Sequence, residues 1–209
     1  MQNRHKISAP HYFNKNYDSK ERFCSYWHQI DEILSLYPAE ILEIGTGNGF
    51  VRNYLKRKNI QTTALDTDFR LQPDVAGSVL RIPFKKQTFD LLSCCQVLEH
   101  LPYASFAAAL EEIYRVSRKY ALLSLPDITT VYRIHIELPG VSKAIKKLMP
   151  HPFPRSPVHR FDGEHYWEIG KKDYPVKRIQ KDIRSSGFRI IRTYRVFEFY
   201  YHRFFVMKK

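Results

Sequence analysis

Residues 41–49 combine an acidic side chain with glycines in a spacing that suits a ligand-binding turn. The segment reads ILEIGTGNG, and its glycines are Gly45, Gly47 and Gly49. Glycine tolerates a positive φ and has no Cβ, so alternate glycines let a flat ligand approach the backbone closely. A second apolar run ends in Asp66, about 20 residues after the first glycine, where Rossmann-like folds place a carboxylate for ribose hydroxyls. Together these features predict a nucleoside site.

The glycine spacing argues against a ligand with a diphosphate. The dinucleotide fingerprint G-x-G-x-x-G requires a third glycine where this chain has Phe50. We therefore expect a nucleoside cofactor without a diphosphate, and the pattern disfavours a nicotinamide-dependent oxidoreductase.

Four segments in a fixed order resemble the class I S-adenosylmethionine-dependent methyltransferases, and in particular the methyltransferase type 11 domain family. They are the turn EIGTGNG, the acidic Asp66, the segment GSVLRIPF at 77–84 and the run FDLLSCCQVLEH at 89–100. Order and spacing agree over residues 41–125. The resemblance implies S-adenosylmethionine as the cofactor and a Rossmann-like α/β fold. That fold is a doubly wound, mostly parallel seven-stranded sheet with a C-terminal antiparallel hairpin, here with an insertion after strand 5.

The resemblance also implies a set of cofactor-binding residues. They are Glu43, Gly45, Thr46, Gly47, Asp66, Ser78, Val79, Cys95 and Gln96. The glycines would lie under the methionyl and ribose parts, Glu43 would order the loop and the ammonium end, and Asp66 would accept the ribose hydroxyls. Ser78 and Val79 would flank the adenine. Many relatives have an aspartate at the Ser78 position to hold the adenine amino group, so this chain departs from the pattern there.

Methyl transfer is an in-line displacement whose chemistry the cofactor supplies, while the protein positions the acceptor about 3 to 3.5 Å from the methyl carbon. An alcohol or amine acceptor must lose a proton, and a positioned base accelerates such a step by roughly 10²- to 10⁴-fold. His100, at the end of QVLEH, is one candidate for this base. The alternative is a histidine that only caps the loop between a strand and a helix.

His165 is the second candidate base. It lies in HRFDGEHYWEIG at 159–170, where histidines, carboxylates and aromatics are crowded as in a substrate lid. The alternative is a packed loop whose histidines are hydrogen-bonded. The segment has neither H-x-E-x-x-H nor paired-cysteine spacing, so we expect no metal site.

The elements that must position these residues alternate between strand and helix. A helix is predicted to begin near Asp18 and end before Pro38, with Phe23, Trp27 and Ile30 on its apolar face. Strands are predicted at 41–45, 62–66, 74–78, 89–95 and 120–125, a helix at 105–117, another from Pro175, and two hairpin strands at 188–197 and 199–207. Such alternation implies a parallel sheet whose ligand binds at the carboxyl ends of the strands.

At 209 residues and 44% hydrophobic content, the chain suits one α/β domain. We divide it into an N-terminal segment with a leading helix (1–39), a cofactor-binding core (40–126), an insertion or substrate lid (127–174), and a C-terminal helix and hairpin (175–209). No apolar run reaches membrane-span length, and MQNRHKISAPHYF has charges where a signal peptide is apolar. Three cysteines do not form an even disulfide set. We expect a cytoplasmic protein.

The net charge of +13 is concentrated toward the C-terminus. Basic residues exceed acidic ones by 0 in residues 1–40, by 3 in 41–126 and by 10 in 127–209. This excess predicts an anionic small-molecule or glycan acceptor, nucleic acid or a membrane surface as partner, or only a solvated basic surface. The segment VSKAIKKLM at 141–149 has helical spacing, as either a membrane-docking helix or a local cover of the active site.

Three functions remain open. The first is methyl transfer to an oxygen or nitrogen of a small molecule or glycoconjugate. The second is an RNA methyltransferase acting on tRNA or rRNA, since the basic region is interleaved with aromatics that stack on bases. The third is a non-catalytic Rossmann-like binding subunit, although the intact turn and Asp66 argue against it.

Overall fold

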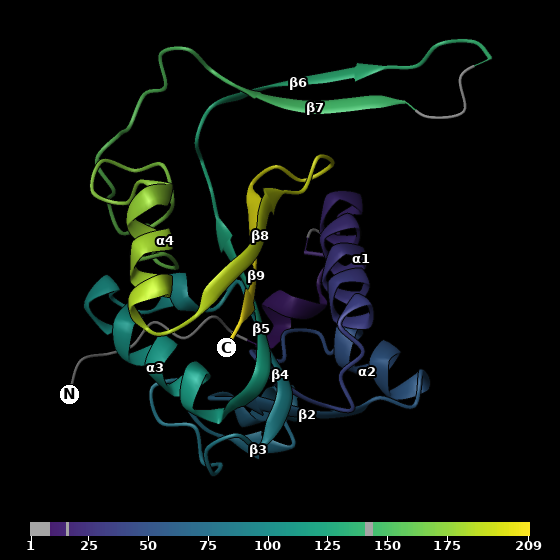
Figure 1. Ribbon diagram of the computed structural model, residues 1–209, viewed down its shortest axis with the longest axis vertical. Helices are drawn as coiled ribbons and strands as arrows, with labels where there is room; N and C mark the ends of the chain where they lie inside the picture. The colour runs from purple at the N-terminus through teal and green to yellow at the C-terminus, as the bar shows by residue number, and fades with distance from the viewer. Residues whose placement is uncertain (1–8, 16, 141–143) are drawn as a thin grey trace.

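The computed structural model describes residues 9–15, 17–140 and 144–209, and a seven-stranded sheet with the order β3-β2-β1-β4-β5-β9-β8 is its centre (Figure 1). The strands are β1 (Glu40–Ile44), β2 (Gln61–Asp66), β3 (Val75–Ala76), β4 (Phe89–Cys95), β5 (Ser117–Pro126), β8 (Arg189–Arg195) and β9 (His202–Lys208). The first five pair in parallel, whereas β9 runs antiparallel to both β5 and β8. The predicted fold class, including the C-terminal hairpin, is confirmed.

Helices cover both faces of this sheet. On one side lie α3 (Phe106–Val116) and α4 (Val176–Ser185), and on the other α1 (Lys20–Ser35) and α2 (Phe50–Arg57) (Figure 1). Four short 3₁₀ helices complete the described elements: η1 (Ala9–Phe13), η2 (Phe69–Leu71), η3 (Leu98–His100) and η4 (Tyr103–Ser105). None of the helices in the described ranges is long and apolar enough to cross a bilayer.

Successive side chains of the central strands enter two separate apolar cores. In β1, Leu42 packs into the core that includes α3 and α4 residues, while its neighbour Ile41 packs into the core that includes α1 and α2 residues. Leu92 and Leu91 divide in the same way on β4. Burial on both faces explains why apolar residues are adjacent at 41–42 and 91–92 and do not alternate with polar ones.

The leading helix and its start near Asp18 are confirmed, but part of its predicted apolar face is exposed. Ser19 caps α1, because its Oγ accepts a hydrogen bond from the Arg22 backbone N–H at 3.3 Å. The buried stripe includes Tyr26, Ile30 and Ile33, whereas Phe23 and Trp27 are 42% and 59% exposed. Two apolar stripes overlap on this helix, and the one that contains Tyr26 faces the sheet.

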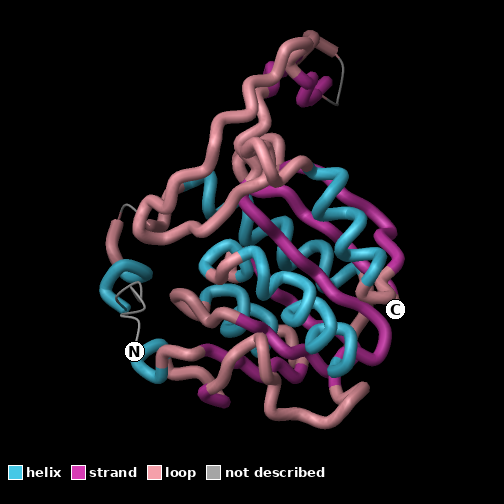
Figure 2. The backbone as a smooth tube through the Cα atoms, turned by 90° about the vertical axis from the view of Figure 1, so that its left-hand side faces the viewer, coloured by secondary structure: helices cyan, strands magenta, loops and turns pink. Residues whose placement is uncertain are grey.

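A projecting hairpin forms part of the insertion after β5. Strand β6 (Val131–Ile136) pairs antiparallel with β7 (Ile145–Pro150), and both lie away from the main body (Figures 1 and 2). The helix predicted over 141–149 is therefore wrong from residue 145 onward, and 141–143 lie outside the described residues. A nine-residue pattern is too short to separate helix from strand, and here the preceding strand β6 supplies the backbone hydrogen bonds.

A buried ion cluster fastens the first residue of the insertion to the C-terminal hairpin. Asp127 is fully buried, and its Oδ2 accepts a hydrogen bond from Arg203 Nε at 2.6 Å. Arg195 donates from Nη2 to the Asp127 carbonyl at 2.8 Å, and its Nε lies 3.7 Å from Oδ2. One carboxylate therefore pairs with two guanidinium groups, one from β8 and one from β9.

We expect Asp127→Asn to lower the free energy of unfolding by about 3 to 5 kcal/mol, because two partly buried cations lose their only anionic partner in the cluster. Urea denaturation measures this directly. The exposed Asp173→Asn is the matched control and should change stability by less than about 0.5 kcal/mol. A loss below about 1 kcal/mol in Asp127→Asn would show that the cluster is not a structural anchor.

Candidate active site

The glycine turn lies where the strand order reverses, between β1 and β4. Gly45, Gly47 and Gly49 have φ values of +84°, +53° and +72°, which favour glycine over other residues. A Cβ on Gly45 would lie 2.4 Å from Cγ2 of Val97, the second residue after β4. The turn therefore packs directly against the segment that carries His100.

Asp66 joins the turns that follow β1 and β2. Its Oδ2 accepts a hydrogen bond from the Thr46 N–H at 2.8 Å, and its Oδ1 accepts one from the Asp68 N–H at 2.9 Å. An ionised carboxylate has about four acceptor positions, so two remain for ribose hydroxyls. Asp68 itself forms an ion pair with Arg70 at 2.6 Å and supports the neighbouring turn.

Glu43 is a buried carboxyl group at the base of this site. Its side-chain Oε2 has no hydrogen-bond partner among the described residues. Burial raises the pKa of Glu43 to about 8, although the charge of Arg52 opposes the shift. An orphaned buried carboxyl group fits a ligand that brings an ammonium group, and the spare acceptors of Asp66 fit a ribose. The residues present therefore match the expected cofactor.

Four more residues were predicted to contact the cofactor, and the structure shows the surroundings of each. The Ser78 hydroxyl accepts a hydrogen bond from the Leu80 N–H at 3.2 Å, and the Val79 side chain is buried in the core. Burial raises the pKa of the Cys95 thiol to about 12, so it stays protonated at neutral pH. Gln96 has a φ of +55°. Cofactor contact by these four residues remains a prediction.

Sequence reasoning missed two tyrosines that cover the glycine turn. The atoms nearest to a Cβ on Gly47 are Tyr17 Oη at 3.8 Å and Tyr12 Cδ1 at 3.9 Å. Their rings meet edge to face, with centroids 5.2 Å apart. Burial and the nearby charge of Asp66 raise the pKa of Tyr12. In the sequence, the available signal was a pair of aromatic residues in a segment without periodicity. Such a pair does not indicate which part of the fold it will contact.

The two candidate bases lie side by side. The ring centroids of His100 and His165 are 5.0 Å apart, although 65 positions separate the residues in the chain. The His100 Nδ1–H donates to the Glu164 carbonyl at 3.0 Å, and the Tyr166 N–H donates to the Glu99 carbonyl at 2.8 Å. These two bonds hold the insertion against the carboxyl end of β4.

His165 belongs to a polar network inside the insertion. Its Nδ1–H donates to Glu168 Oε1 at 3.1 Å, and Tyr201 donates to the same oxygen. Burial opposes a charged imidazole, but the hydrogen bond to Glu168 and the nearby carboxylates raise the pKa of His165. Burial also opposes ionisation of Glu168, yet His165 and Tyr201 lower its pKa to about 2. The hydrogen bond from Nδ1–H to Glu168 therefore fixes the orientation of the His165 ring.

Part of the expected lid is built into the core. Trp167 and Ile169 are fully buried, and Trp167 Nε1–H donates to the Leu101 carbonyl at 3.1 Å. The Ile169 N–H donates to the Pro126 carbonyl at 3.0 Å. Residues 165–169 are thus a fixed wall beside η3.

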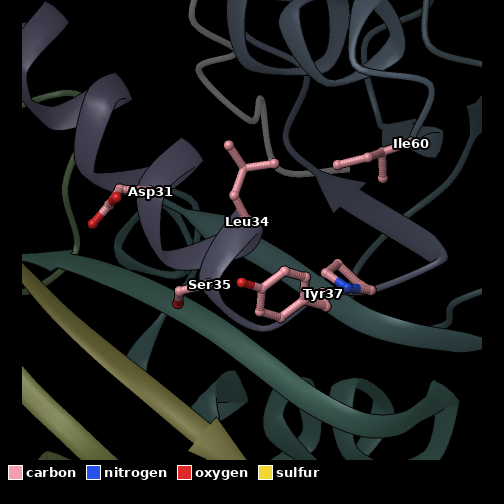
Figure 3. A pocket seen from close by; sticks show the side chains of 6 residues that line it. Asp31, Leu34, Ser35, Tyr37 and Ile60 are labelled. Atoms are coloured by element: carbon pink, nitrogen blue, oxygen red, sulfur yellow. The ribbon is translucent and has the colours of Figure 1, made fainter.

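A hollow of about 480 Å³ lies elsewhere, at the amino ends of β1 and β2 (Figure 3). It is lined by Asp31, Leu34, Ser35, Tyr37, Pro38 and Ile60. Because ligands of parallel α/β sheets bind beyond the carboxyl ends of the strands, this hollow is at the wrong edge for the cofactor.

Known proteins share both the sequence core and the fold. Residues 42–125 match the family described as methyltransferase domain. An uncharacterised protein of Methanocaldococcus jannaschii is 34% identical over 84 residues, which are 37% of this chain and 36% of that protein. The matched region is thus about a third of the length of this curated relative.

Two solved structures cover nearly the whole chain. A SAM-dependent methyltransferase from Aquifex aeolicus has a TM-score of 0.62 at 15% identity, covering 97% of this chain and 99% of the other. A Burkholderia thailandensis 1,6-didemethyltoxoflavin-N1-methyltransferase with bound S-adenosylhomocysteine has a TM-score of 0.56 at 14% identity, covering 98% and 92%.

The chain therefore has the fold of the solved methyltransferases, and its matched segment agrees with the resemblance to class I methyltransferases. More narrowly, residues 42–125 form a methyltransferase domain of the type 11 family. The predicted fold is confirmed, and the domain match and the shared fold both support the predicted class and its cofactor.

Glu43 predicts a distinct pH dependence of stability. Its pKa rises from 4.5 to about 8 on folding, so between these values the native state retains a proton that the unfolded chain has lost. The free energy of unfolding therefore falls as the pH rises across this window. Glu43→Gln should remove this component. Urea denaturation at pH 5, 6.5 and 8 should show the variant gaining stability relative to wild type as pH rises, whereas a constant difference would contradict the assignment.

Asp66→Asn should weaken S-adenosylmethionine binding at least tenfold, because an amide cannot accept both backbone N–H groups and the ribose hydroxyls. Calorimetric titration measures the affinity, and thermal melting shows whether the variant is folded. Asp31→Asn, at the opposite edge of the sheet, is the matched control and should bind like wild type. Equal affinities in the two variants would remove Asp66 from the cofactor site.

Proposed function

We propose that the chain transfers the methyl group of S-adenosylmethionine to an oxygen or nitrogen of a small-molecule or glycoconjugate acceptor. The observation that carries this proposal is the meeting of the orphaned Glu43, the glycine turn and Asp66 at one edge of the sheet, beside His100. The cofactor supplies an electrophilic sulfonium methyl. The protein binds it, excludes water and orients the acceptor.

The paired histidines are the proposed place where the acceptor loses its proton. His100 and His165 meet beside the segment that packs on Gly45, which puts polar groups next to the cofactor turn. Their Nδ1 atoms are hydrogen-bonded to Glu164 and Glu168, which leaves each Nε2 to face an acceptor. A base held in this way contributes roughly 10²- to 10⁴-fold to such reactions.

The basic surface supports an anionic acceptor. Residues 127–209 carry an excess of 10 basic side chains, and they include both the wall at 165–169 and the projecting hairpin.

An RNA acceptor is the second candidate, because Tyr132 on the hairpin and Phe153 beyond it are 52% and 82% exposed beside basic residues. RNA binding would weaken steeply with added salt, whereas binding of a small acceptor through a few contacts would not.

Calorimetric titration with S-adenosylmethionine, S-adenosylhomocysteine and NAD tests the proposal. We expect saturable binding of the first two and none of NAD, because the turn at Phe50 lacks the glycine that a diphosphate needs. Methyl transfer is then screened with radiolabelled cofactor against anionic small molecules, glycans and RNA. Absence of binding to both sulfur ligands would overturn the proposal and favour a non-catalytic subunit.

A further inference from the structure

Glu99, His100 and His165 form a cluster with the chemistry of a metal site. Each offers one ligand atom, and all three atoms lie within 4.8 Å of one another. Among the described residues, this is the one group of at least three histidine, cysteine or acidic side chains with such spacing. Ligands around a single tetrahedral Zn²⁺ lie roughly 3.3 Å apart, so side-chain rotations that shorten the spacing by at most about 1.5 Å would close the site.

The hydrogen bonds around both histidines leave a nitrogen for a metal. Because His100 and His165 donate from Nδ1 to a carbonyl and a carboxylate, the Nε2 of each ring keeps its lone pair when the ring is neutral. Histidine ligands of metal ions almost always have such a partner on the other ring nitrogen, because it fixes the tautomer and the ring orientation. Tyr201 in turn donates to Glu168.

Glu99 is an independent sign of a missing partner. Its side chain is fully buried, and Oε2 has no hydrogen-bond partner among the described residues. With the Gln96 amide oriented to satisfy both ends, its nitrogen donates to Glu99 Oε1 at 3.1 Å and its oxygen accepts from the Leu125 N–H at 3.2 Å. Gln96 thus holds one oxygen of Glu99 and leaves the other free. A buried carboxylate with one unpaired oxygen is costly unless a cation joins it.

We propose that Glu99, His100 and His165 bind one divalent transition-metal ion. Two imidazoles and one carboxylate suit ions such as Zn²⁺ better than Mg²⁺, which prefers oxygen ligands alone. The chain spacing gave no indication of this site, because two ligands are adjacent and the third lies 65 positions further along.

Three protein ligands leave coordination positions open. An acceptor hydroxyl bound there would lose its proton more easily, since a metal ion lowers the pKa of a bound oxygen acid. In this arrangement the histidines hold the ion, and the proton of the bound hydroxyl would pass to solvent water, which reaches the partly exposed His100. This role rests on the proposed methyl transfer and narrows the acceptor to a hydroxyl-bearing compound. Metal binding itself does not depend on that function.

Zn²⁺ titration of chelator-treated protein tests the site. We expect one equivalent to bind and the melting temperature to rise with Zn²⁺ concentration. His165→Ala and Glu99→Gln should each lower Zn²⁺ affinity by more than about 100-fold, and Glu168→Gln by roughly 10- to 100-fold as an outer-shell partner. His135→Ala, on the projecting hairpin, is the matched control and should bind Zn²⁺ like wild type.

Wild-type protein without saturable Zn²⁺ binding, or unchanged affinity in both ligand variants, would overturn the proposal, as would tighter binding of Mg²⁺ than of Zn²⁺. Titration of the same chelator-treated proteins with S-adenosylmethionine separates the two claims. Retained cofactor binding with no metal binding would refute only the metal site. Loss of cofactor binding in wild type would refute the proposed function and leave the metal result standing by itself.

Discussion

The close approach of Gly45 to Val97 is the constraint on which the rest of the site depends. A single added Cβ would lie 2.4 Å from the valine methyl, so only glycine permits β1 and the segment after β4 to meet at this distance. This contact places the cofactor turn and the Glu99–His100 pair on one edge. Asp66 then fixes the turn from the other side by accepting the Thr46 N–H. The glycine turn and the Glu99–His100 pair are therefore neighbours because two strand ends touch.

The molecule surrounds this edge with elements from distant parts of the chain. Tyr12 and Tyr17 cover the glycine turn from the N-terminal side. The wall at 165–169 arrives from the insertion, where buried Trp167 reaches the Leu101 carbonyl. Asp127 and its two arginines fasten the start of that insertion to the C-terminal hairpin. The edge of the sheet that carries the histidine pair thereby gains a wall from distant parts of the chain.

Buried carboxyl groups account for much of the site's chemistry. Glu43 and Glu99 both have an oxygen without a hydrogen-bond partner among the described residues, and burial raises both of their pKa values. The environments differ, since Glu99 faces two histidines whereas Glu43 lies under the turn. A cationic ligand relieves the same electrostatic cost in each place. The proposed ammonium and metal ligands would therefore each offset the cost of a buried carboxylate.

The sequence by itself determined the α/β order, the turn at Gly45 and Gly47, and the carboxylate at Asp66. These features are local, because positive φ depends on glycine and parallel strands bring their carboxyl ends to one edge. Only the tertiary structure decided which stripe of α1 is buried, that 145–150 is a strand, and that His100 meets His165. The first and the last depend on residues far away in the chain, and the strand at 145–150 depends on pairing with 131–136 after the chain turns back. Short-range periodicity carries no information about such a partner, since the contacts with the partner's side chains and backbone form only when the chain folds.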